Sequence, residues 1–118
     1  MKINDLVANV FAIRNAAHLA HWATNSLAQH MALDEFYNGV IEKLDTIVEA
    51  YQGYYGLIGK VEQITFEPTD IADQIADMAQ LIARERSNIS NGTQAIENLI
   101  DDLTATFFKT FYKLCNLR

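Results

Sequence analysis

Two histidines and three carboxylates stand at spacings that could place them around a metal ion. Asp34 follows His30 by four residues, and Asp45 and Glu49 repeat that spacing farther along the chain, while His21 precedes them all. Imidazole and carboxylate together are ligands of iron, manganese and zinc, whereas magnesium and calcium prefer oxygen alone. Two histidines with three carboxylates and open positions suit a non-haem iron centre best.

Helical geometry limits how these side chains can meet. Counted from His30 at about 100° per residue, Asp34, Asp45 and Glu49 lie at about 40°, 60° and 100°, on one side of one helix. His30 and Asp45 are nevertheless about 22 Å apart along the helix axis. They cannot bind the same ion in the same chain. Either the pairs form two sites, or two chains meet antiparallel around a two-fold axis and complete one site together.

The helices that must position these residues follow from apolar periodicity. The first is predicted from about Asn4 to Ala23, and the second begins near Leu27, because Ser26 and Gln29 have the spacing of a capping box. Their apolar stripes are Leu6, Val10, Ile13, Ala17 and Ala20 in the first helix, and Leu33, Phe36, Val40, Leu44, Ile47 and Tyr51 in the second.

The second half of the chain predicts two more helices. We expect residues 59–68 to be extended, with Ile64 and Phe66 pinning them to the helices, and Thr69 to be the N-cap of the third helix. Asn91 and Gly92 end that helix. The apolar stripe of the third helix is Ile71, Ile75, Met78, Ile82 and Ile89. The apolar stripe of the fourth helix is Ile96, Leu99, Ile100, Leu103, Phe107, Phe111 and Leu114. These elements predict one all-α domain over residues 1–118, a four-helix bundle.

Composition sets the remaining limits. A length of 118 residues fits one domain, and a single cysteine, Cys115, excludes a disulfide within the chain. We expect Cys115 to be a buried small hydrophobe. The net charge of −6 argues against sequence-blind binding to nucleic acid. No apolar run is long enough to span a membrane and the N-terminus lacks signal-peptide features, so we expect a cytoplasmic location, or the host cytoplasm if the gene is viral.

The same residues carry a family resemblance. The segment from His18 to Trp22, followed by His30, Asp34 and the pair at 45–49, resembles the ferroxidase signature of the Dps mini-ferritins. The resemblance implies a ferritin-like bundle with a short extended connection between its second and third helices. We also expect His18 and Trp22 to lie just outside the metal ligands, where His18 would hold a water or a carboxylate and Trp22 would pack beside the site. The metal ligands that the resemblance implies are His21, His30 and Asp34 from one subunit, and Asp45 and Glu49 from its two-fold mate.

The function implied by the resemblance is oxidation of Fe(II) by peroxide or dioxygen. One or two irons would bind at each site between subunits, and a shell of up to twelve chains would store the ferric product. The chain departs from the family in having a shorter interval between the His21-Trp22 pair and His30, and in lacking the helix that usually connects the second and third helices. It also has no lysine-rich tail, so DNA binding is not expected.

Two alternatives stay open at this point. The first is a simple up-down-up-down bundle, because ten extended residues reach about 33 Å, which barely spans a third helix of similar length. The second is a non-enzymatic helical dimer or scaffold that retains a metal-binding face.

Overall fold

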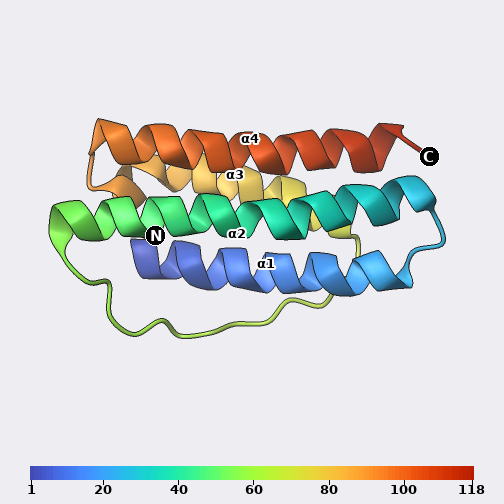
Figure 1. The fold of residues 1–118 in the computed structure, drawn as a ribbon, viewed down its shortest axis with the longest axis horizontal. Coiled ribbons are helices and arrows are strands. Elements are labelled where there is room, and N and C mark those ends of the chain that lie inside the picture. The colour runs from blue at the N-terminus through green and yellow to red at the C-terminus, as the bar shows by residue number, and fades with distance from the viewer.

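The computed structural model describes all of residues 1–118 and consists of four α-helices (Figure 1). The helices are α1 (Ile3–Ala23), α2 (Leu27–Tyr55), α3 (Ile71–Ser90) and α4 (Gln94–Asn116). The structure has no strand, so the prediction of an all-α four-helix bundle is confirmed. None of the helices is both long and apolar enough to cross a membrane.

The connection between α2 and α3 determines the topology. Residues 56–70 run along the outside of the bundle from one end to the other, so α2 and α3 point in the same direction (Figure 1). Helix α1 packs against α2 and α3, and α4 packs against the same two helices. A bundle with one long crossover has the connectivity of ferritin-like folds, and the simple up-down-up-down arrangement is excluded.

The predicted apolar stripes form one continuous core. A cluster of 24 buried hydrophobic side chains draws on all four helices. At its centre, the rings of Phe36 on α2 and Phe107 on α4 meet edge to face, with centroids 5.0 Å apart, and neither is exposed. This contact turns the Phe36 side of α2 toward the core. The acidic residues Asp34, Asp45 and Glu49 of the same helix are exposed.

The side chain of Asn4 on α1 holds the crossover against the bundle. The amide of Asn4 donates to the carbonyls of Ile58 and Lys60, at 2.9 Å in both cases. Phe66 packs against the core, as predicted, but Ile64 is 44% exposed, so only half of the predicted pinning pair is right. Side chains two residues apart in an extended segment share a face only if the segment is regular, and residues 56–68 form no strand.

The starts of α2 and α3 differ in how well the sequence predicted them. The Ser26 hydroxyl accepts a hydrogen bond from the backbone N–H of Gln29 at 3.2 Å, which confirms Ser26 as the N-cap of α2. The Thr69 prediction is wrong, because Asp70 is the residue before α3 and has a left-handed φ of 47°. The Thr69 amide is used in a bond to the Glu67 carbonyl, so the turn after the proline ends one residue later than predicted.

The end of α3 is as predicted, whereas the position of the cysteine is not. Asn91 and Gly92 adopt left-handed conformations with φ of 53° and 73°, as the predicted helix end requires. Cys115, in contrast, is exposed. It follows the buried Leu114 and is therefore rotated by about 100° away from the core-facing line of α4.

Candidate metal site

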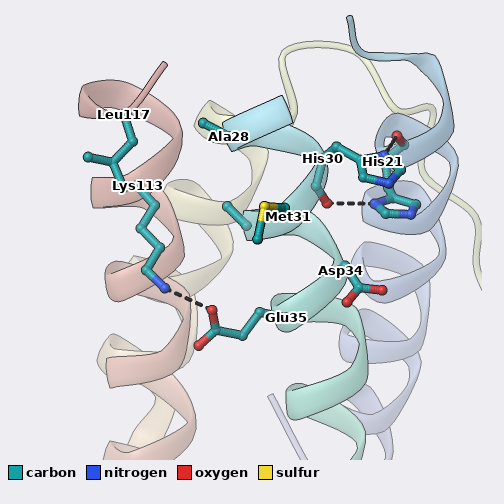
Figure 2. A pocket seen from close by; sticks show the side chains of 9 residues that line it. His21, Ala28, His30, Met31, Asp34, Glu35, Lys113 and Leu117 are labelled. Carbon is teal, nitrogen blue, oxygen red and sulfur yellow. Dashed lines mark hydrogen bonds and ion pairs between the residues drawn. The ribbon is translucent and has the colours of Figure 1, made fainter. Parts of the chain in front are cut away.

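His21 and His30 form a reciprocal pair across the turn between α1 and α2. Their rings stack with centroids 3.6 Å apart and an interplanar angle of 19°. Nδ1 of His21 lies 2.6 Å from the carbonyl oxygen of His30, and Nδ1 of His30 lies 2.9 Å from the carbonyl oxygen of His21 (Figure 2). A carbonyl can only accept, so both Nδ1 atoms carry the proton and donate.

This pairing determines what the second ring nitrogen can do. In a neutral imidazole with a protonated Nδ1, Nε2 keeps its lone pair. Neither Nε2 has a hydrogen-bond partner within the chain. Histidines that bind metals commonly donate their other N–H to a backbone carbonyl, which fixes the tautomer and the ring orientation. His21 is only 7% exposed and His30 is half-buried, so the pair is rigidly held at the end of the bundle.

Asp34 lies one helical turn beyond His30 and is exposed. Its Oδ1 accepts from the hydroxyl of Tyr37 at 2.8 Å and from the amide of Asn38 at 3.3 Å. Its Oδ2 accepts no hydrogen bond from this chain. The carboxylate is therefore anchored through one oxygen and free at the other.

His21, His30 and Asp34 border a surface hollow of about 750 Å³ between α2 and the last turns of α4 (Figure 2). On the α4 side, Lys113 extends to Glu35 and the two meet at 2.8 Å, with Lys109 joining at 3.3 Å. Hydrogen bonds from Lys113 and then Lys109 hold the pKa of Glu35 below its ordinary value. Glu35 is thus neutralised by lysines, which leaves Asp34 as the free carboxylate of this hollow.

The second carboxylate pair lies toward the opposite end of α2. Asp45 and Glu49 are both exposed, and neither forms a hydrogen bond or an ion pair within the chain. No group of three or more histidine, cysteine, aspartate or glutamate side chains within one chain could hold a metal ion. The structure therefore brings His21 and His30 together with Asp34 nearby, and it does not bring Asp45 and Glu49 to them.

The aromatic residues beside the histidine pair form a second layer. The His18 ring stacks on the Tyr37 ring at 3.9 Å and 12°, and the Trp22 ring lies 4.5 Å from His18. Burial, followed by the charges of Arg14 and His21, lowers the pKa of His18. Trp22 is 68% exposed, so it lies at the rim of this layer.

Tyr37 is the residue of this region that sequence reasoning missed. It is 8% exposed and falls at a core spacing on α2, so it resembles an ordinary buried aromatic residue. Its hydrogen bond to Asp34 raises the pKa of the Tyr37 hydroxyl. The one signal available was its position three residues after Asp34, a spacing at which helical side chains meet.

Comparison with known proteins places the chain in a family without assigning a role. The chain is 29% identical over 118 residues to an uncharacterized 14.6 kDa protein in the mobD-ri intergenic region of Enterobacteria phage T4. The matched region covers 96% of this chain and 88% of the phage protein. No solved structure matches the chain significantly. Residues 21–114, which include His21, His30, Asp34 and the pair at 45–49, match the model of a family of unknown function (DUF5856). The protein therefore belongs to the DUF5856 family.

Proposed function

We propose that two copies of this chain bind Fe(II) between them and oxidise it with peroxide or dioxygen. The ligands are His21, His30 and Asp34 of one chain, with Asp45 and Glu49 of the partner subunit. The observation that supports this best is the histidine pair, in which both Nδ1 atoms are engaged by backbone carbonyls and both Nε2 atoms are free. This arrangement prepares imidazoles for a metal ion without requiring one for folding.

The spacing along α2 fits a two-fold pairing of this helix. The midpoint of His30 and Glu49 and the midpoint of Asp34 and Asp45 both fall between positions 39 and 40. An antiparallel partner helix centred at that point places His30 opposite Glu49 of the partner subunit, and Asp34 opposite Asp45 of the partner subunit, at the same time. Two equivalent sites result, as two-fold symmetry requires.

Charge supports a cation at each of these sites. Asp34, Asp45 and Glu49 have no ion-pair partner within the chain. Bringing such carboxylates together costs free energy through mutual repulsion, which a bound cation offsets. The mixture of imidazole nitrogen and carboxylate oxygen favours a first-row transition metal over magnesium or calcium.

Iron is the substrate in this proposal, and the chain holds it during electron transfer. Two Fe(II) ions each give up one electron to a peroxide molecule, which takes up two protons and leaves as two waters. The carboxylates favour Fe(III) over Fe(II) because they are hard anionic ligands, and they therefore favour the oxidised product. The host cytoplasm is the proposed location, in keeping with the phage relative.

The direct test is the rate of aerobic Fe(II) oxidation, followed by ferric absorption in the near ultraviolet. We expect the protein to oxidise Fe(II) faster than buffer, and an Asp45→Ala/Glu49→Ala variant to lose this advantage. Asp73→Ala/Asp77→Ala is the matched control, because these exposed aspartates have the same spacing on α3. Equal rates for wild type and the Asp45→Ala/Glu49→Ala variant would refute the proposal.

Storage is a separate part of the proposal. A closed shell of roughly twelve chains would have a mass near twelve times the 13.3 kDa of one chain, which light scattering measures. A mass of two chains excludes storage but leaves oxidation at the interface possible.

A specific observation favours one other candidate, a non-enzymatic helical dimer. The His21–His30 pair joins the end of α1 to the start of α2 through two hydrogen bonds and a ring stack, with no metal required. Under this candidate, the histidines hold α1 to α2, and a metal ion that binds the retained face is not oxidised.

A further inference from the structure

Tyr37 connects α1 to the free carboxylate of the candidate site. Its ring stacks on His18 with centroids 3.9 Å apart, and the guanidinium carbon of Arg14 lies over the ring at 5.0 Å. Both neighbours come from α1, whereas Tyr37 and Asp34 are on α2. The ring is 8% exposed, and its hydroxyl donates to Oδ1 of Asp34 at 2.8 Å.

This environment limits the orientations available to Asp34. An exposed aspartate on a helix ordinarily samples several rotamers. Here one oxygen is held by a hydroxyl whose own position is fixed by ring contacts from the neighbouring helix. The Asn38 amide reaches the same oxygen at 3.3 Å. Both donors therefore engage Oδ1 and leave Oδ2 to accept a cation.

The partner half of the proposed site has no equivalent support. Asp45 and Glu49 are exposed, and no hydroxyl or amide within the chain bonds to their carboxylates. The ligand set is thus unequal, with an ordered half formed by the histidine pair and Asp34, and an unsupported carboxylate half supplied by the partner subunit.

We propose that Tyr37 is a positioning residue that orients Asp34 for a divalent transition-metal ion and so sets the affinity of the ordered half of the site. This inference rests on the proposed function, since it concerns the same site. Groups that orient a metal ligand through a hydrogen bond contribute about 10-fold to 100-fold in affinity. Loss of the Tyr37 hydroxyl is therefore expected to weaken binding by about that factor.

The test uses Co(II), whose visible absorption reports both affinity and coordination geometry, in anaerobic titrations of the full-length protein. The variant is Tyr37→Phe, which retains the ring and its stacking. The matched control is Tyr55→Phe, which removes a hydroxyl bonded to Thr93 at the other end of α2. We expect Tyr37→Phe to bind Co(II) about 10-fold or more weakly, with a changed visible spectrum, and Tyr55→Phe to match wild type.

A second comparison shows whether Tyr37 acts through Asp34. In an Asp34→Ala background, adding Tyr37→Phe should produce no further loss of affinity, because the hydroxyl no longer has a carboxylate to orient. A further loss of the same size in that background overturns the positioning role. If wild type binds Co(II) and Tyr37→Phe binds it equally well with the same spectrum, the inference fails and the proposed function stands. If wild type binds no Co(II), the proposed function itself fails, and the inference fails with it.

Discussion

Replacing His21 with alanine measures how much the histidine pair contributes to the stability of the fold, apart from the metal binding that we propose for it. The change removes a ring that is 7% exposed, its stack on His30 and the hydrogen bond from its Nδ1. The lost hydrogen bond costs about 1 kcal/mol, and truncating a buried ring of this size costs about 2 kcal/mol more. The expected loss in the free energy of unfolding is therefore about 3 kcal/mol.

The matched control for this change is His18→Ala. His18 is half-buried and stacks on Tyr37, but it forms no hydrogen bond within the chain, so its removal should cost less stability than the removal of His21. The assay is urea unfolding at about pH 8 with a chelator present. If the His21→Ala variant is as stable as the His18→Ala variant, the pair does not join α1 to α2, and the reasoning is refuted.

Repeating the measurement with Co(II) tests the metal binding that we propose for the pair. A ligand at about 100 times its Kd stabilises the folded state by about 2.7 kcal/mol. We expect this gain in wild type and in His18→Ala, and its absence in His21→Ala. An equal gain in the His21→Ala variant would mean that the ion binds elsewhere.

Three further predictions concern the frame around the site. Phe107→Ala should destabilise the bundle by about 3–5 kcal/mol in urea unfolding, because the ring is fully buried against Phe36, and a loss below about 1 kcal/mol would contradict the packing. Hydrogen bonds from Lys113 and Lys109 lower the pKa of Glu35 in the folded state. The ion pairs between Glu35 and these lysines therefore stabilise the fold above the unfolded pKa of glutamate, and this stabilisation disappears as the pH falls. Because the pair is exposed, Glu35→Gln should lower stability by less than about 1 kcal/mol at neutral pH and by nothing at acid pH, and a loss that persists in acid would be inconsistent with this cause. Asn4→Ala should release the crossover and speed tryptic cleavage after Lys60, whereas an unchanged cleavage rate would show that the two amide bonds do not hold this segment.

The sequence predicted the bundle because its signal is repeated many times. Each helix has several apolar residues at intervals of three or four, and residues such as Val10, Val40 and Ile100 all proved to be fully buried. A single wrong position does not alter such a pattern. The one-residue error at Thr69 and the exposed Cys115 arose where one residue alone had to indicate a boundary or a direction.

The site was predicted less completely because its geometry depends on contacts between helices. The spacing of His30 and Asp34 showed that they share a face, but not that the two histidine rings stack. Both Nδ1 atoms donate to backbone carbonyls. Because every residue has a backbone carbonyl, the sequence contains no residue type from which this pairing could be predicted. Tyr37 was missed for a related reason, since its role depends on a hydroxyl direction set by α1.

The joining of two chains at one site is the central claim, and mixing two inactive variants tests it most directly. One variant, His30→Ala/Asp34→Ala, lacks the ordered half, and the other, Asp45→Ala/Glu49→Ala, lacks the carboxylate half. After the two are unfolded together and refolded in equal amounts, roughly half of the dimers contain one chain of each kind, and in each of these one of the two sites is complete. If the two chains share each site, aerobic Fe(II) oxidation returns to about a quarter of the wild-type rate. A mixture no faster than the average of the two separate variants would contradict this claim.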